Sequence, residues 1–301
     1  MEVARQVPGP DDLRSRLAGY AGVHLANGRR VAGEDLPAAD EELERSLALW
    51  RTGAAEDPGL LNAARVLGLE ASLRRAQRRL PEALALIDQA LAIDSWGETP
   101  ALLLAKARAL VELGEFEASI ALLQAVHQMN ADREPRKRYV VCNLLVLNLC
   151  HAGRYAAAEL LLPELGALAL RLGNRLDLLR ADWLAGKVAA GQGRADEAVA
   201  ILGRVRDQFL ALHNAYVFAL ATLELAEVHA ALGHTAEVKA LARESAPVFA
   251  DQEIHREAQR ALELFCCAVE EERLTAELLR SLIAYLCRAR YDPQLRFEQV
   301  P

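Results

Sequence analysis

The apolar positions of this chain recur at helical spacing. Near the start, residues three or four positions apart are apolar: Leu13, Leu17, Tyr20, Ala21 and Leu25. This spacing is typical of the buried face of an α-helix. Helical segments are separated by breaks such as Asp57-Pro58-Gly59, and Thr99-Pro100 predicts the start of a further helix. The pattern predicts a chain of many short helices.

Residues 182–202 predict two helices folded back on each other around a tight turn. Gly193 stands where the first helix ends, and glycine readily adopts the left-handed conformation that closes a helix. Gly186 lies inside the first helix, where glycine costs roughly 1 kcal/mol against alanine unless another segment must approach closely. We expect Ala198 on the second helix to be its small partner.

The same hairpin recurs along the chain. Its hinge glycines are separated by 39, 40 and 40 residues: Gly114, Gly153, Gly193 and Gly233. Seven positions before each glycine stand Ala107, Val146, Gly186 and Ala226, and five after stand Ser119, Ala158, Ala198 and Val238. An earlier copy contains Ala71, Arg78, Leu80 and Ala83, and a weaker one spans about residues 13–49. Six copies at similar spacing indicate a repeat array, in which each unit buries its apolar face against the next.

These motifs resemble the tetratricopeptide repeat, in which an aromatic residue follows the glycine by two positions and a small residue follows it by five. The matching segments are Gly-Glu-Phe-Glu-Ala-Ser119, Gly-Arg-Tyr-Ala-Ala-Ala158, Gly-Arg-Ala-Asp-Glu-Ala198 and Leu-Pro-Glu-Ala83. The usual repeat has 34 residues, so a period near 40 implies longer helices or linkers and approaches the range of HEAT and armadillo repeats.

Four other stretches resemble the tetratricopeptide halves of bacterial multidomain regulators. They are Arg-Val-Ala-Gly-Glu-Asp-Leu-Pro-Ala-Ala-Asp40, Leu-Glu-Ala-Ser-Leu-Arg-Arg75, Glu-Val-Lys-Ala-Leu-Ala242 and Arg-Ala-Arg-Tyr-Asp-Pro-Gln-Leu-Arg-Phe297. Many such regulators carry an N-terminal helix-turn-helix or anti-sigma-type zinc segment. Residues 1–50 contain no Cys and one His, so a zinc segment is not expected there. The resemblance implies a regulatory setting.

The predicted fold is all-α: a right-handed superhelical solenoid of about six tetratricopeptide-like hairpins and a C-terminal capping helix pair. We expect a flexible arm at 1–11, the repeat array at 12–250, capping helices at 251–290 and a tail at 291–301. The fourth to sixth hairpins are expected near 137–172, 174–212 and 214–249. Thr275 is expected to cap the last helix.

Composition supports an all-α fold. Hydrophobic residues make up 52% of the chain but aromatic residues only 5%, so the core consists mainly of Leu and Ala, which suit helix packing. A net charge of −7 disfavours nucleic-acid binding, which relies on a basic surface. No apolar run approaches the 18 residues of a membrane span, and the first residues lack the apolar core of a signal peptide. These features favour a cytoplasmic protein without a membrane segment.

Neither a catalytic centre nor a metal site is predicted. The five cysteines contain no Cys-x-x-Cys pair and are interpreted as buried, reduced thiols: Cys142, Cys150, Cys266, Cys267 and Cys287. His255-Arg-Glu257 lacks the Pro-Cys-x-x-Cys partner of zinc deaminases. His229 and His234 lack the spacing of a His-Glu-x-x-His helix. There is no phosphate-binding loop, and we expect no enzyme, cofactor or metal.

Two basic clusters leave two interpretations open. The first contains Arg133, Arg136, Lys137 and Arg138, and the second contains Arg74, Arg75, Arg78 and Arg79. Each is interpreted either as a solvated loop or as a contact for an acidic partner or a phosphate group.

The tetratricopeptide resemblance implies a binding groove lined by the first helix of each hairpin. The corresponding positions are Leu104, Arg108, Asn143, Leu147, Arg180, Trp183, Lys187, Leu223 and Glu227. Trp183 is expected to dominate, because Trp and Arg are enriched in binding hot spots. The chain lacks the full Lys/Asn/Arg set with which some tetratricopeptide proteins bind a C-terminal carboxylate. We expect Trp183→Ala combined with Lys187→Glu to abolish partner capture and leave helicity intact.

The predicted function is a non-catalytic scaffold that binds a peptide or protein segment in this groove, in bacterial regulation or signalling. The main alternative is a small-peptide or metabolite sensor domain of a transcriptional regulator. An RNA-binding repeat would need a basic groove, and an enzyme would need an acid, base or nucleophile constellation. The sequence does not indicate the oligomeric state.

Overall fold

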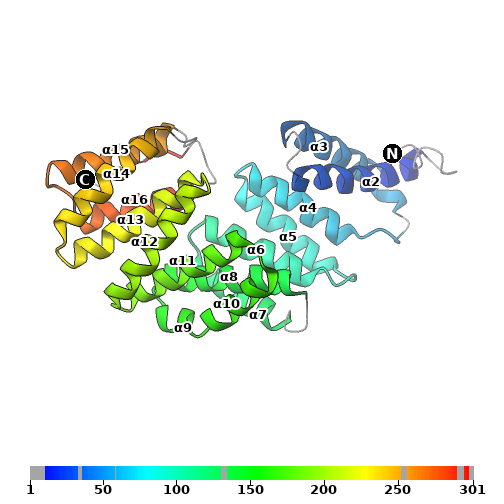
Figure 1. The fold of residues 1–301 in the computed structure, drawn as a ribbon. Helices are drawn as coiled ribbons and strands as arrows, with labels where there is room; N and C mark the ends of the chain where they lie inside the picture. Colours follow the sequence, from blue (N-terminus) through cyan, green and yellow to red (C-terminus); the bar gives the residue numbers. More distant parts are fainter. Residues whose placement is uncertain are drawn as a thin grey trace. The chain divides into compact units, whose positions relative to one another are not determined.

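The computed structural model describes residues 11–32, 36–57, 59–129, 134–251, 256–289 and 295–297 (Figure 1). These residues form helices joined by turns and loops, and the described part of the chain contains no β-strand. The all-α prediction is therefore confirmed. The chain divides into two compact units, Met1–Met129 and Asn130–Pro301, and this boundary falls next to the most charged linker of the sequence.

Unit 1 is built from consecutive antiparallel helix pairs. The pairs are α2 (Asp11–Ala32) with α3 (Leu36–Thr52), α4 (Ala63–Ala76) with α5 (Leu80–Ile93), and α6 (Thr99–Glu112) with α7 (Phe116–Met129). A short 3-10 helix, η1 (Ala54–Glu56), follows α3. Each pair packs on the next because α4 contacts α2 and α6, while α5 also contacts α6. This arrangement matches the predicted hairpin order.

Unit 2 continues the pattern with longer helices. Its elements are α8 (Pro135–His151), α9 (Tyr155–Glu159), α10 (Leu162–Leu172), α11 (Arg175–Gly191), α12 (Ala195–Ala211), α13 (Ala215–Ala231), α14 (Thr235–Asp251), α15 (Arg256–Glu270) and α16 (Ala276–Ala289). The second helix of the fourth hairpin was expected to be continuous, but it is divided in two. Helix α9 ends at Glu159, and α10 starts at Leu162. Pro163 lies in the first turn of α10. Proline lacks an amide hydrogen and clashes with the preceding turn, so the helix ends and restarts there.

The hinge glycines occupy equivalent bends, as predicted. Their φ angles are all positive: 83° at Gly114, 70° at Gly153, 75° at Gly193 and 73° at Gly233. After α11, the amide of Gly193 donates to the carbonyl of Ala190 at 3.0 Å, and the next amide donates to Ala189 at 2.9 Å. These bonds satisfy carbonyls that the helix end leaves without partners. In the earlier copy, Arg78 adopts a φ of 62° at the same position.

Gly186 does allow a close approach, but its neighbour differs from the prediction. A Cβ atom at Gly186 would lie 2.8 Å from the Leu202 Cδ2 atom, so the space beside the glycine is filled by leucine. Ala198, the expected partner, is fully buried one turn earlier on α12. The larger side chain of Leu202 reaches across the pair, and this contact requires a residue without a side chain at position 186.

Helix α13 is enclosed on almost every face. All residues from Phe218 to Ala226 are buried, and α12, α14 and α16 pack against this helix. The capping helix α15 packs on α14, whereas α16 packs on α13. The Thr275 hydroxyl accepts a hydrogen bond from the Leu278 amide at 3.1 Å, so the predicted cap of α16 is confirmed. The capping pair therefore covers the face of α13 that its hairpin neighbours leave open.

Candidate binding surface

The predicted groove residues divide between the two units. Leu104 and Arg108 lie on α6 of unit 1. The others lie on first helices of unit 2: Asn143, Leu147, Arg180, Trp183, Lys187, Leu223 and Glu227. Helix α11 packs against α8 on one side and α13 on the other, so these residues share one layer. We refer to this surface as the α8–α11–α13 layer.

The side chains of Trp183 and Lys187 both contact Glu224, which was not among the predicted groove residues. The Trp183 indole donates to the Glu224 carboxylate at 2.6 Å, and the Lys187 ammonium pairs with the other oxygen of the same carboxylate. The Lys187 nitrogen also lies 5.4 Å from the centre of the Trp183 ring. A signal for Glu224 existed, because it is an acidic residue inside the apolar run from Phe218 to Ala226.

The ion pair between Lys187 and Glu224 is a structural element of the fold. Burial by itself would lower the pKa of Lys187, but the adjacent Glu224 carboxylate overrides burial and holds the pKa above its usual value. Lys187 is therefore a cation at neutral pH, paired with Glu224. The expected role of Lys187 as a surface cation is corrected, because its charge is already compensated by the neighbouring helix.

Two of the expected apolar contacts lie in the core. The Leu223 side chain has an exposed fraction of 0%, and that of Trp183 is 6%. Both belong to one hydrophobic cluster, which also contains Leu282 and Leu286 of α16. The prediction that Leu223 faces a partner is wrong for this structure, because this side chain lies in the core beneath neighbouring helices. Trp183 is likewise packed and hydrogen-bonded within the fold.

Other residues of the layer keep unused bonding capacity. Asn143 and Leu147 are half-buried on α8, and the Asn143 amide makes no hydrogen bond with any described residue. Glu227 is half-buried and forms no hydrogen bond or ion pair within the described ranges. Burial and then Glu224 raise the pKa of Glu227, while Arg280 and Lys187 oppose this shift. These side chains can bind a group from outside the chain.

The described residues of the first basic cluster belong to a helix of unit 2. Arg136, Lys137 and Arg138 lie in the first turn of α8, whereas Arg133 lies outside the described residues. Arg136 pairs with Asp177 of α11, and Arg138 donates to Glu164 of α10 at 2.7 Å. For these three residues, the solvated-loop interpretation is therefore wrong. Arg180, a predicted groove residue, faces the same Asp177 at 3.9 Å.

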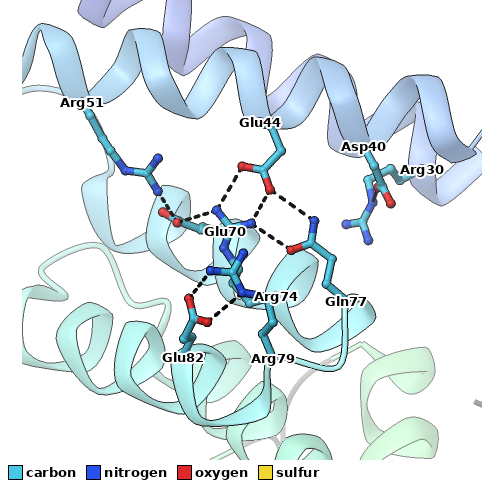
Figure 2. A network of polar contacts seen from close by, with 9 residues as sticks. All are labelled: Arg30, Asp40, Glu44, Arg51, Glu70, Arg74, Gln77, Arg79 and Glu82. Carbon is cyan, nitrogen blue, oxygen red and sulfur yellow. Dashed lines mark hydrogen bonds and ion pairs between the residues drawn. The ribbon is translucent and has the colours of Figure 1, made fainter. Parts of the chain in front are cut away.

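The second basic cluster joins neighbouring helices of unit 1 (Figure 2). Arg74 on α4 donates to Glu44 of α3 at 3.0 Å and to Glu70 at 3.3 Å, and Glu70 also pairs with Arg51. Arg79 donates to Glu82 at 2.7 Å. Arg75 and Arg78 both pair with Glu112 of α6. The arginines of this cluster therefore form ion pairs within unit 1, which corrects the solvated-loop interpretation.

Two surface pockets lie among the described residues of unit 1. The larger has a volume of about 410 Å³ and is lined by Pro37, Asp40, Glu41, Glu44, Arg45 and Gln77. The smaller has a volume of about 60 Å³ and lies beside Arg108, together with Ala71, Ser72, Arg75, Ile87 and Ala105. Leu104 and Arg108 are half-buried. Arg108 thus borders a small recess between first helices of unit 1.

The described residues contain no cluster of three or more His, Cys, Asp or Glu side chains that could hold a metal ion. No helix in the described ranges is both long and apolar enough to cross a membrane. Cys142 and Cys150 are buried as expected, and burial raises the pKa of these thiols to about 12 and about 11, respectively. Cys267 is exposed, so the expectation of a buried thiol is wrong at that position.

Comparisons with known proteins address the fold. No protein-family profile and no curated protein matches the chain. A crystal structure of a tetratricopeptide repeat protein from Parabacteroides merdae is similar, with a TM-score of 0.58 and 16% identity over 89% of this chain and 99% of that chain. The chain has a tetratricopeptide-like fold.

A second similar structure is a Rap protein in complex with competence and sporulation factor. The TM-score is 0.63 and the identity is 14%, over 97% of this chain and 84% of that chain. At these identities, the likeness describes the fold alone. It agrees with the hinge glycines and the paired helices, and the predicted helical-repeat architecture is confirmed.

Proposed function

We propose that this chain is a non-catalytic scaffold that binds a peptide or protein segment along the α8–α11–α13 layer of unit 2. The observation that carries this proposal is the pair of half-buried polar side chains, Asn143 and Glu227, that form no hydrogen bond or ion pair with any described residue. Partly buried polar groups favour a binding partner because they have lost part of their hydration. Helical-repeat proteins commonly use such extended surfaces to bind other chains.

The layer offers complementary contacts for an extended or helical segment. Asn143 can donate and accept hydrogen bonds, and Leu147 lies one turn further along the same helix. Glu227 can accept a hydrogen bond from a cationic or amide group. The Lys187–Glu224 pair does not contact the partner but holds α11 against α13, and therefore positions these groups. The Rap protein of the comparison was crystallised as a complex, which supports a binding role for this fold.

The resemblance to the repeat halves of bacterial regulators supports a regulatory setting, and we propose that the protein acts in the cytoplasm. In such a setting, the scaffold would position a partner protein and perform no chemistry itself. The experiment below tests binding without assuming the identity of the partner.

The direct experiment is selection of binding peptides from a random peptide library displayed on phage, with the full chain immobilised. We expect selected peptides to bind the wild type and to bind Asn143→Ala and Leu147→Ala at least about tenfold more weakly, the size expected for loss of a central contact. Leu160→Ala is the matched control, because this leucine is 81% exposed and lies outside the layer. Equal binding by all variants would exclude this surface.

The variant Trp183→Ala combined with Lys187→Glu is not a suitable test. Lys187→Glu would place a second carboxylate beside buried Glu224, and Trp183→Ala would remove a packed indole that donates to the same carboxylate. Both changes destabilise the core. The expectation that helicity survives this double change is therefore corrected.

The small-peptide or metabolite sensor is the second candidate. The 410 Å³ pocket of unit 1 has the volume of a small-molecule site. Most of its lining residues are polar or charged, but the atoms that face the pocket are mainly apolar, as is usual for such sites. Thermal-shift screening against fractionated small molecules, with Glu41→Gln as the site variant, distinguishes this candidate from a protein scaffold. A wild-type shift that Glu41→Gln abolishes would favour the sensor.

A further inference from the structure

Two arginines of unit 2 converge on one buried carboxylate. Arg136 of α8 pairs with one oxygen of Asp177, and the Arg180 guanidinium of α11 lies 3.9 Å from the other. The Asp177 side chain is 1% exposed, whereas those of Arg136 and Arg180 are 47% and 44% exposed. The acid therefore lies beneath the two guanidinium groups, which reach the surface.

This arrangement carries a surplus positive charge. The buried Asp177 carboxylate faces two guanidinium groups, one from Arg136 and one from Arg180. Compensation of a buried carboxylate needs a single cation, and Arg136 already provides it through direct contact. Arg180 makes the longer contact, and it forms no hydrogen bond with any residue that the structure describes. Its planar donor group is therefore free to bind an oxyanion.

Arg136 is also held in place. The Tyr139 hydroxyl donates to the Asp177 carbonyl at 2.8 Å, which ties α8 to the start of α11. The Arg136 guanidinium lies 5.6 Å from the centre of the Tyr139 ring, within the range of a cation–π contact. Fixing a guanidinium in advance reduces the entropy cost of binding a ligand. The Arg136 guanidinium is therefore positioned before any ligand arrives, and Arg180 lies beside it on the same carboxylate.

We propose that Arg136 and Arg180 form a binding site for the side-chain carboxylates of an acidic peptide segment. This inference rests on the proposed scaffold function and deepens it, because it states the charge of the partner. Arg180 lies three residues before Trp183 on α11, so a segment bound here continues onto the α8–α11–α13 layer. The chain has a net charge of −7, so a local basic site gives an acidic partner one preferred place to bind.

The test is fluorescence anisotropy of a fluorescein-labelled octaglutamate peptide with the full chain, compared with labelled octaglutamine. Binding is measured at about 20 mM and about 200 mM salt, because salt screens exposed charges. We expect octaglutamate to bind and octaglutamine not to bind, and Arg180→Gln to weaken octaglutamate binding about tenfold, as expected for loss of a charge-assisted hydrogen bond. This variant keeps the Arg136–Asp177 pair, so the fold is preserved.

Two control variants separate a specific site from general charge. Arg204→Gln removes the same charge from an exposed position on α12, and we expect binding within about twofold of the wild type. Arg136→Lys keeps the charge but loses the planar fork, and we expect weaker binding than in the wild type. Equal weakening by Arg204→Gln and Arg180→Gln would overturn the proposal, as would equal binding of octaglutamate and octaglutamine or a failure of octaglutamate to bind.

A phosphoserine peptide of equal length tests the other source of an oxyanion. Binding of the phosphoserine peptide alone would overturn the assignment to carboxylates. Failure of the acidic site can also be distinguished from failure of the scaffold function. Phage-selected neutral peptides that depend on Asn143 would preserve that function, even if octaglutamate does not bind.

Discussion

At the scale of single residues, Glu224 organises the centre of unit 2. Its carboxylate binds the Trp183 indole and the Lys187 ammonium, and all three groups lie away from solvent. A buried ion pair of this kind contributes little net stability compared with apolar packing, but removal of one partner leaves an uncompensated charge. The pair therefore fixes the position of α11 relative to α13 more than it adds to the total free energy of folding.

Glu224→Gln is expected to lower the free energy of unfolding by about 3 kcal/mol, because Lys187 would remain buried without a counter-charge. Adding Lys187→Met should recover part of this loss, because the uncompensated charge is then removed. Urea denaturation followed by circular dichroism measures both variants. A loss below about 0.5 kcal/mol for Glu224→Gln, typical of an exposed pair, would contradict this account.

Glu227 gives a prediction with a defined pH dependence. Burial and Glu224 raise its pKa in the folded chain, so folding favours the protonated form. The contribution of this carboxyl to stability is therefore present below its unfolded pKa of about 4.3 and is lost as the pH rises through the folded pKa. Glu227→Gln should raise the unfolding temperature at neutral pH, and this gain should disappear near pH 4.

Thermal unfolding of the wild type and Glu227→Gln across this pH range is the measurement. A lower unfolding temperature for the variant at neutral pH would show that the opposing effect of Arg280 dominates. Glu237→Gln, at an exposed position of α14, is the control for removal of a surface charge.

At the scale of elements, the turns define the hairpins. Gly193 ends α11 with a φ of 75°, and His213 follows α12 with a φ of 51°. A residue with a Cβ atom is strained in this region by about 1 kcal/mol or more, whereas glycine is not. The chain therefore uses glycine at four of its hairpin hinges, whereas Arg78 occupies the hinge between α4 and α5 and His213 the turn between α12 and α13.

Opposite substitutions at these two turns should have opposite effects. Gly193→Ala is expected to destabilise the chain by about 1 kcal/mol, and His213→Gly is expected to stabilise it by up to about 1 kcal/mol. The exposed position of His213 makes loss of packing a minor effect. Chemical denaturation measures both changes, and a stabilising Gly193→Ala would show that this bend does not need a left-handed residue.

Sequence periodicity predicted the elements well because each hairpin is specified locally. The hinge glycines and the apolar spacing lie within one repeat, so they could be read without a structure. The ion pairs could not, since Arg136 and Asp177 are 41 positions apart in neighbouring repeats. The interruption beside Pro163 was not predicted either, because the fourth hairpin was expected near 137–172 as a simple helix pair.

At the scale of the whole molecule, the groove prediction was limited by one tertiary contact. Helix α16 packs on α13, and no repeat signal in the sequence places a capping helix there. Leu223 is therefore buried, although its position in the repeat predicted a surface residue. Asn143, Leu147 and Glu227 keep some exposure on the same layer. A regular repeat thus gives the positions of candidate contacts, and the irregular end of the array decides which of them a partner can reach.

The tetratricopeptide-like fold and the half-buried polar groups lead to one central claim, that a peptide binds along α8 and α11. Hydrogen-exchange mass spectrometry of the full chain, with and without a phage-selected peptide at saturation, tests it most directly. The account predicts slower exchange in residues 135–151 and 175–191 and unchanged exchange in α12 and α14. Protection confined to α12 and α14, or to unit 1, would contradict it.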